Sequence, residues 1–223
     1  AKLSKPTLVH NQYLYLAYGL SRWSTIFYKE YTQEIERALL KSLDLFFNSL
    51  DEFGYAPYAD KTIATTLNGV TTYYHGRTLA FCWGIIDNLS ISSLHKRKYI
   101  DKLQKSTVFL SKMYLQDGNK QLLLDTKRYY FQGEYESASH AHDIYVFHRM
   151  YEITGDSFWV KIASKSLDLL LKSQDEAGCI NSHTLDLPNH EWQCGVMRTG
   201  HLAWLVKTPL NFLKKALNSD CIK

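Results

Sequence analysis

The stretch SHAHDIYVFHRMYEITGDSFWVKIASKSLDLLLKSQDEAG, from Ser139 to Gly178, decides the fold of this chain. Apolar residues recur at three- and four-residue spacing over 143–153, which predicts a helix with one buried face. A second apolar stripe over 159–171 predicts another helix. Between them, Thr154-Gly155-Asp156 offers a left-handed glycine and a helix-capping carboxylate. The stretch is therefore expected to form an αα-hairpin, two antiparallel helices joined by a tight turn.

The remainder of the chain reads as weaker copies of this hairpin. Amphipathic or aromatic helices are predicted over residues 10–27, 32–49 and 99–113, and another is predicted to begin near His75. Gly200-His201 opens a last apolar helix, and residues 214–223 read as a polar tail. Loops of about twenty residues, predicted before His75, over 119–138 and after Gly178, fall on the same side of each helix pair. Long loops in equivalent places are typical of a binding face.

The residues predicted to end and to begin these helices recur at regular intervals. Glycines that end helices, Gly54, Gly118 and Gly178, are 64 and 60 residues apart. Histidines at the following helix starts, His10, His75, His142 and His201, are 65, 67 and 59 residues apart. A period of this size built from helix pairs indicates a solenoid or toroid, in which each hairpin buries its apolar face against its neighbours. We therefore expect an all-α fold in a single hairpin-repeat domain over residues 1–223.

Composition narrows the classes of partner. The net charge is only +4, and its basic residues are spread along the chain, so we expect no nucleic-acid partner. No apolar run approaches the roughly 18 residues of a transmembrane span, so we expect no membrane span. Four cysteines without paired short spacing predict neither a disulfide framework nor a zinc ribbon, and they favour a reducing compartment, the cytoplasm.

One repeat unit carries a family resemblance. The pattern His142-Asp143-x-Tyr145, Thr154-Gly155-Asp156, Trp159, Ala163, Leu170-Leu171 and Asp175-x-x-Gly178 resembles the hairpin repeat of the (α/α) toroid carbohydrate-active enzymes. These include six-hairpin glycosidases, polysaccharide lyases and the N-acylglucosamine 2-epimerase group. The resemblance is clearest over residues 140–205, and it implies a partial or complete toroid that acts on an oligo- or polysaccharide. Because many families with different chemistry share the signature, its specificity is for architecture.

Two features depart from that pattern. The epimerases place a glutamate three residues after the histidine, whereas this chain has Tyr145 after His142 and Trp204 after His201. A closed toroid also needs about six hairpins, whereas the predicted helices make roughly three and a half. Three interpretations stay open: a partial toroid, a fragment that is incomplete at its N-terminus, and a protomer that completes its surface as a homo-oligomer.

The repeated histidines are the leading catalytic candidates. In a toroid the N-termini of the inner helices converge, which would bring His75, His142 and His201 to one mouth together with His10. A helix N-terminus disfavours the imidazolium, so such a histidine stays neutral and can accept a proton. Asp143 could orient a histidine or act as an acid. The competing interpretation is that these histidines cap or pack helices and that Asp143 is an ordinary helix N-terminal charge.

Substrate contacts are expected from charged and aromatic side chains near the same mouth. Arg77 could hold a carboxylate or phosphate of a sugar, or form a surface salt bridge. Loop tyrosines and tryptophans could stack on sugar rings, or simply pack. The predicted substrate-binding residues are Arg77, His10, Tyr74, Tyr135, Trp192 and Glu191. We expect no cofactor and no metal, because His140-x-His142 is too short a pattern to predict a metal site.

The leading functional hypothesis is a carbohydrate-active enzyme that uses histidine-based proton transfer on a sugar or uronic-acid glycan, as an epimerase (an isomerase) or lyase. A six-hairpin glycosidase is an alternative, although it needs two carboxyl groups about one bond. No pair stands out by spacing among the loop candidates Asp60, Asp125, Glu134, Glu136, Asp186 and Glu191. A further alternative is a non-catalytic glycan-binding or scaffold module in polysaccharide assembly, which the missing glutamates favour. An α-solenoid that binds protein fits the aromatic, histidine-rich pattern less well.

Overall fold

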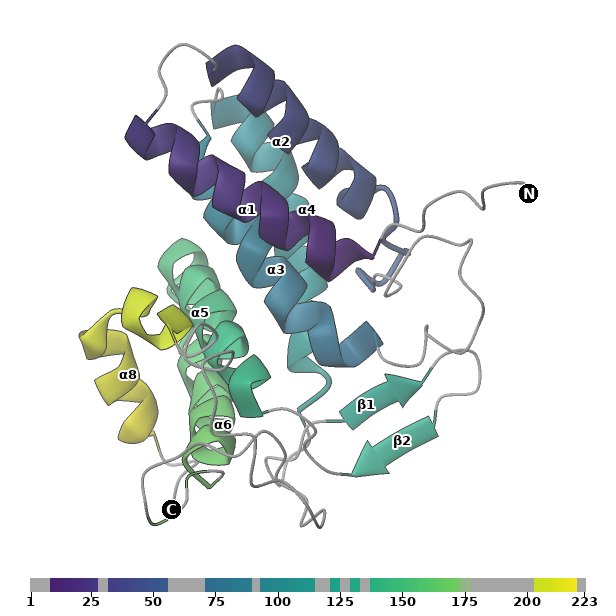
Figure 1. Cartoon of the computed structure of the whole chain (residues 1–223). Coiled ribbons are helices and arrows are strands. Elements are labelled where there is room, and N and C mark those ends of the chain that lie inside the picture. Colours follow the sequence, from purple (N-terminus) through teal and green to yellow (C-terminus); the bar gives the residue numbers. More distant parts are fainter. Residues whose placement is uncertain are drawn as a thin grey trace. The chain divides into compact units, whose positions relative to one another are not determined.

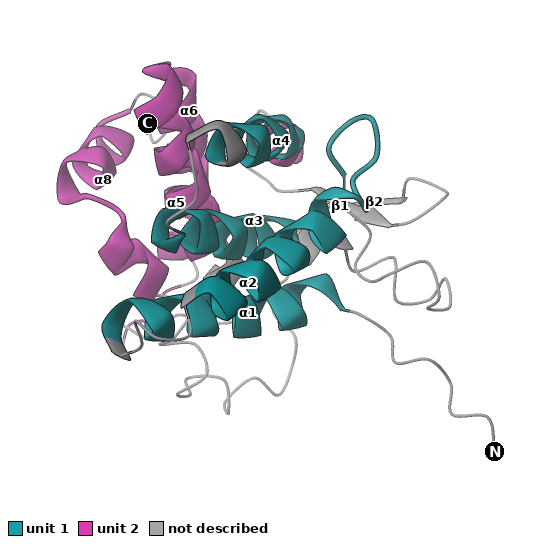
Figure 2. Cartoon of the chain, turned by 90° about the horizontal axis from the view of Figure 1, so that it is seen from above, with its two compact units in different colours: residues 1–109, 124–128 teal, residues 110–123, 129–223 magenta. Residues whose placement is uncertain are grey.

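The structure is a computed structural model, which describes residues 9–27, 32–55, 71–89, 93–114, 121–124, 129–132, 137–172, 174, 176 and 203–219 (Figure 1). The chain separates into two compact units, coloured separately in Figure 2. Unit 1 holds residues 1–109 and 124–128, and unit 2 holds residues 110–123 and 129–223. Most described elements are helices, which confirms the all-α fold class. The single domain over 1–223 stays a prediction.

Four described helices belong to unit 1. Helices α1 (His10–Phe27) and α2 (Thr32–Phe47) precede α3 (Thr71–Asn88) and α4 (Ser93–Ser111), whose last two residues belong to unit 2. Helix α1 packs against both α2 and α3. The large side chains of its core are fully buried, and burying each stabilises the fold by about 1.5–3 kcal/mol. They are Leu14, Leu43, Phe46, Leu79, Trp83 and Leu103.

The turn after α2 is specified locally by its sequence. The Asp51 carboxylate accepts backbone N–H bonds from Phe53 at 2.9 Å and Tyr55 at 2.8 Å, which closes a compact turn. Gly54 lies inside it at φ +89°, a conformation that L side chains rarely adopt. A Cβ added at Gly54 would lie 2.9 Å from the backbone of Lys105 on α4. The predicted helix-ending glycine is therefore required both for the turn and for the close approach of α4.

Unit 2 contains the hairpin predicted most strongly from the sequence. Helix α5 (Ser137–Thr154) packs along α6 (Phe158–Lys172), as Figure 1 shows in green. Gly155 has φ +67°, and the Asp156 carboxylate accepts the Phe158 N–H at 2.9 Å, so the predicted left-handed glycine and cap are confirmed. Trp159 is buried and stacks on Phe147 at 6.0 Å between ring centroids.

The predicted last helix is interrupted. Residues 203–207 are helical, and α8 (Leu210–Leu217) begins after Pro209, which has no N–H to continue a helix. Phe212 and Ala216 are buried four residues apart, so α8 packs in unit 2 through one face. The prediction that a polar tail begins at Lys214 is wrong for 214–217, because an amphipathic helix carries these lysines on its exposed side. Lys215 Nζ donates to Tyr151 Oη at 3.0 Å.

Other boundaries also differ from the predictions. Helix α3 begins at Thr71 and α5 at Ser137, so His75 and His142 lie in the second turn and not at the helix start. The span 119–138, predicted as a loop, contains β1 (Gln121–Leu124) and β2 (Tyr129–Gln132) in a two-stranded sheet. Short apolar and aromatic runs such as QLLL and YYFQ fit a strand as well as a loop. Of the helices that the structure describes, none combines the length and apolarity that crossing a bilayer requires.

Candidate functional site

A buried polar cluster joins α5, α6 and the end of α4 in unit 2. Tyr114 follows α4, its N–H bonding the Ser111 carbonyl at 3.3 Å, and its side chain is 6% exposed. Its hydroxyl lies 2.5 Å from Asp143 Oδ2 and 3.2 Å from His140 Nδ1. The Ser166 hydroxyl on α6 also donates to Tyr114 Oη. We call these four residues, Tyr114, His140, Asp143 and Ser166, the Tyr114 cluster.

The hydrogen bonds of this cluster have one consistent direction. Ser166 donates to Tyr114, and the single Tyr114 proton is donated to Asp143 Oδ2. Because Tyr114 donates its only proton to Asp143, its oxygen can only accept from His140. We therefore assign the tautomer of His140 in which Nδ1 carries a proton and donates to Tyr114 Oη. Three neighbouring groups, Ser166, His140 and Asp143, thus meet at the Tyr114 hydroxyl.

Burial makes this carboxylate unusual within the molecule. Asp143 is 0% exposed, and it is the one buried carboxylate among the residues that the structure describes. Taking an ionised carboxylate out of water is costly unless hydrogen bonds compensate it. Helix α5 carries Asp143 on one buried face with His140 and Phe147, at three- and four-residue spacing, so two polar residues share this face with an apolar ring. A buried ionisable group of this kind can transfer a proton or stabilise a developing positive charge.

His142 lies beside the cluster in sequence but faces a different neighbour. Its ring is 5.3 Å from the Trp204 ring, and Trp204 meets Tyr145 edge-on at 4.8 Å. Lys207 Nζ lies 4.3 Å from the Trp204 ring centroid. Tyr145 and Trp204 are the residues three positions after His142 and His201 in the sequence, and their rings pack against each other.

In unit 1, His75 makes a structural clamp. Its Nε2 lies 3.2 Å from the Ser106 carbonyl oxygen and 3.1 Å from Ser106 Oγ, whose own proton is donated to the Gly54 carbonyl at 2.5 Å. A carbonyl oxygen can only accept, so Nε2 carries a proton and is the donor. His75 is 2% exposed and packs edge-on against Phe109 at 5.5 Å. Nε2 therefore acts as a hydrogen-bond donor in this arrangement, and the catalytic role predicted for His75 stays a prediction.

His10 is also a packed residue. Its ring meets Phe46 edge-on at 5.7 Å, and Nδ1 lies 2.9 Å from Tyr13 Oη. Burial first, and then the nearby Cys82, raise the pKa of Tyr13 far above its usual range. Burial likewise raises the pKa of the Cys82 thiol, so Tyr13 and Cys82 are both neutral at pH 7. His10 opens α1 as predicted, in a neutral aromatic environment.

The other predicted site residues are only partly placed. Arg77 is buried on α3 at 8% exposure, which argues against a surface salt bridge. His75 and Arg77 belong to unit 1 and His142 and Asp143 to unit 2, so convergence on one cleft stays a prediction. Tyr74 lies in α3, but its side chain is outside the described part. Also outside the described residues are His201, Tyr135, Trp192, Glu191 and the loop carboxylates Asp60, Asp125, Glu134, Glu136 and Asp186.

Sequence reasoning missed Tyr114 and Ser166 and set His140 aside as half of a weak metal pattern. A signal was present: Ser106 and Ser166 stand on the core-facing stripes of their helices, 60 residues apart, the same interval as Gly118 to Gly178. Both serines are fully buried and hydrogen-bonded to neighbouring segments. No set of three or more His, Cys, Asp or Glu side chains suited to a metal ion occurs in the described ranges.

The comparisons with known proteins agree with the fold. A polysaccharide lyase aligns with TM-score 0.67 and 13% identity over 93% of this chain and 62% of its own. A possible glycoside hydrolase family 105 member from Salmonella enterica serovar Paratyphi A aligns with TM-score 0.63 and 14% identity over 91% of this chain and 56% of its own. The chain has an (α/α) toroid-type fold. The resemblance to that superfamily, predicted from the sequence, is confirmed at the level of fold.

A further structure, a glycoside hydrolase of family 105 from C. acetobutylicum, aligns with TM-score 0.59 and 13% identity over 79% of this chain and 52% of its own. The chain thus spans between about half and under two thirds of the length of these three proteins. No protein-family model matches the sequence, and the search of curated proteins found no match.

Proposed function

We propose that this protein acts on an oligo- or polysaccharide, with the Tyr114 cluster supplying the group that transfers a proton or stabilises charge. The observation that carries the proposal is the buried Asp143 carboxylate, which receives the Tyr114 hydrogen bond at 2.5 Å. The fold shared with a polysaccharide lyase and family 105 hydrolases supports the substrate class. Asp143 was among the catalytic residues predicted from the sequence. Of the predicted histidines, His75 supports the proposal least, because its Nε2 already donates to the Ser106 carbonyl.

The roles of the remaining groups follow from their donors and acceptors. Tyr114 fixes the carboxylate orientation and can relay its proton, since it lies between Ser166 and Asp143. His142, on the same turn of α5 as Asp143, is the second acid/base candidate of unit 2. If Asp143 or His142 removes a C–H proton from a sugar or uronic acid, the protein acts as an epimerase or a lyase. Arg77 remains the residue proposed to bind the carboxylate of a uronic acid.

The test is a panel of neutral and uronic-acid oligosaccharides incubated with the protein in deuterated water and read by NMR and mass spectrometry. Deuterium in an intact sugar indicates an epimerase, an unsaturated product indicates a lyase, and a shortened saturated product indicates a hydrolase. Asp143→Asn keeps the side-chain size but cannot ionise, and we expect at least a roughly 100-fold loss of turnover. Helical circular dichroism should stay as in the wild type.

Unit 1 offers a matched control. Tyr99 Oη donates to Asp44 Oδ1 at 2.9 Å between α4 and α2, and burial together with this bond raises the pKa of Tyr99 to about 12. Asp44→Asn removes a tyrosine-bonded carboxylate of the same kind that lies outside the Tyr114 cluster, and turnover should be unchanged. Wild-type turnover by Asp143→Asn would remove this carboxylate from the mechanism.

A non-catalytic glycan-binding module is the second candidate. It is favoured by the aromatic pair Tyr145 and Trp204, which stand where the epimerases carry glutamates, and by Lys207 above the Trp204 ring. In that case the same panel gives saturable chemical-shift changes without any product. Trp204→Ala would then weaken binding, whereas Asp143→Asn would leave it unchanged.

A further inference from the structure

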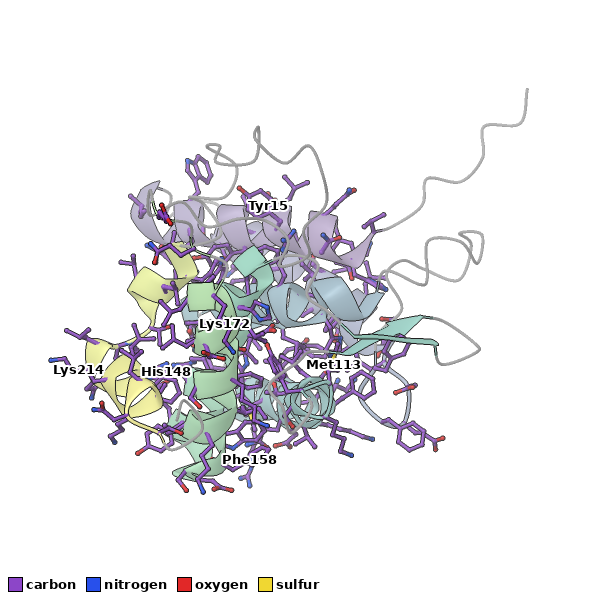
Figure 3. The ribbon with its side chains drawn as sticks, turned by 90° about the horizontal axis from the view of Figure 1, so that it is seen from below. Tyr15, Met113, His148, Phe158, Lys172 and Lys214 are labelled. Atoms are coloured by element: carbon purple, nitrogen blue, oxygen red, sulfur yellow. The ribbon has the colours of Figure 1, made fainter. Side chains whose placement is uncertain are left out.

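Helix α8 and the short helical segment before it follow one face of α5 in unit 2 through contacts between rings. Trp204 meets Tyr145 at 4.8 Å between ring centroids. Phe212 on α8 meets His148 at 5.0 Å and Tyr151 at 5.6 Å. His148, labelled in Figure 3, is 6% exposed and lies against the first turn of α8. A titratable ring is therefore part of the contact between α5 and α8.

Helix α8 is short and is held by few contacts. It has eight residues, and a helix of that length is unstable in water without tertiary packing. Its N-cap residue is Pro209, which provides no side-chain hydrogen bond to the first turn. Phe212 and Ala216 are its buried residues, and Lys215 Nζ donates to Tyr151 Oη at 3.0 Å. An element of this kind can separate from its unit at a lower free energy than the unit needs to unfold.

The place of His148 in this contact suits a neutral ring and not an imidazolium. Its Nδ1 is buried and has no hydrogen-bond partner among the described residues. Its Nε2 lies 3.7 Å from Glu152 Oε1, beyond hydrogen-bond distance, and Glu152 Oε2 already accepts from Arg149 Nη1 at 2.5 Å. An imidazolium carries a proton on both nitrogens. Protonation in place would therefore bury an N–H without an acceptor and set a second cation on one carboxylate.

The other charges on α5 and on the elements that pack against it do not favour the imidazolium. Asp143 on α5 receives the Tyr114 hydrogen bond, and the carboxylate of α6, Asp168, is paired with Lys172 Nζ at 2.6 Å. Helix α8 and residues 203–207 carry no carboxylate. The cations on these elements are Lys161, Lys165, Lys172, Lys207, Lys214 and Lys215. A protonated ring would therefore depend on Glu152 alone.

We propose that α8 is an acid-released helix: when His148 takes up a proton from solvent, α8 separates from α5 and both ring N–H groups bond to water. Burial lowers the pKa of the packed His148 from its ordinary value of 6.5, Glu152 raises it and Arg149 lowers it. In the released state the ring is hydrated and regains its ordinary pKa. The packed state thus binds fewer protons, so release becomes more favourable as the pH falls below 6.5, by at most about tenfold per pH unit.

The test is amide hydrogen exchange of the full chain between pH 8 and pH 5, read by mass spectrometry and corrected for the intrinsic exchange rate at each pH. The amides of α8, such as Leu213 N–H, which bonds the Pro209 carbonyl at 3.1 Å, report its release. We expect their protection to fall by roughly 3- to 30-fold between pH 7 and pH 5. The amides of α6 should keep their protection, since the unit stays folded. In His148→Gln the protection of α8 should be independent of pH, whatever its level at pH 8.

Glu152→Gln separates His148 from its neighbour as the group that takes up the proton. It removes the carboxylate that favours the imidazolium in the packed state, so the fall in α8 protection should be as large as in the wild type or larger. If protonation of Glu152 caused the release, this variant would show no fall. That result overturns the proposal, as does a fall that persists in His148→Gln. Constant protection of α8 in the wild type, or an equal loss in α6, overturns it as well.

Discussion

The His75 clamp of unit 1 and the Tyr114 cluster of unit 2 occupy corresponding places in the repeat, yet they differ in chemistry. In each, a buried serine of the second hairpin helix donates a hydrogen bond: Ser106 to the Gly54 carbonyl and Ser166 to the Tyr114 hydroxyl. His75 is followed by Gly76, whereas His142 is followed by Asp143. The His75 clamp therefore joins His75 and Ser106 to backbone carbonyls and contains no carboxylate. The Tyr114 cluster surrounds the carboxylate of Asp143. Repetition preserved the hydrogen-bonding position but not the reactive group.

The largest stability difference is expected between the two left-handed glycines. Gly54→Ala would put a Cβ on a residue with an unfavourable φ, and that Cβ would lie 2.9 Å from the Lys105 backbone. We expect it to lower the free energy of unfolding by about 2–4 kcal/mol. Gly155→Ala has a similar φ of +67° but open space among the described residues, and should lower it by only about 1 kcal/mol. Urea denaturation measures both, and equal losses would mean that Gly54 is not crowded.

The two serines should separate stability from activity. Ser106→Ala and Ser166→Ala each remove a buried hydrogen bond and should each lower the free energy of unfolding by about 1–2 kcal/mol. Turnover per folded molecule should fall only in Ser166→Ala, because Ser166 supports the tyrosine that holds Asp143. Denaturation curves and the oligosaccharide assay give the two quantities. A similar loss of turnover in Ser106→Ala would place the clamp in the mechanism as well.

The smallest expected effect is a pH dependence of the free energy of unfolding, caused by His148 in unit 2. Burial lowers the pKa of His148 below its ordinary value of 6.5, Arg149 lowers it further, and Glu152, 3.7 Å away, acts in the opposite direction. Phe212 of α8 covers the ring edge-on at 5.0 Å and carries no charge. Since the folded state resists protonation, the unfolded chain binds the proton first as the pH falls. His148 thus contributes stability that is full above pH 6.5 and is lost as the pH falls through the lowered pKa.

Urea midpoints measured between pH 8 and pH 5 would show this loss. The comparison variant is His148→Gln, whose side chain does not titrate, so its stability should decrease less over the same interval. Parallel curves for the two proteins would contradict the assignment.

Most of the fold could be predicted from the sequence because its signals are local. The stripe over 10–27, the capped turn at Gly155 and the glycine at position 54 each act within a few residues, and the structure confirms them. The starts of α3 and α5 were missed because TTYY and SASHA carry weak helical periodicity. The strands β1 and β2 were missed because runs of four residues have no resolvable period.

The candidate site was predictable only in part. Asp143 and His142 stood out because a charged and a titratable residue interrupt an otherwise apolar stretch. Their partners did not, since Tyr114 is 29 residues from Asp143 and Ser166 is 52 residues from Tyr114. Contacts at such separations depend on how α4, α5 and α6 pack, which no local pattern encodes. The hydrogen-bond partner of His75 was missed for the same reason, because Ser106 lies 31 residues away.

The short connection at Gly155 bears on how the chain acquires its structure. Helices α5 and α6 are joined through three residues, 155–157, so closing this loop loses little chain entropy. The contacts between these helices are mostly local in sequence, and local contacts form fastest in folding. The hairpin of unit 2 can therefore assemble before the clamp of unit 1, whose partners Gly54 and Ser106 are 52 residues apart. It would be the first part of the molecule to protect its amide hydrogens from exchange during refolding.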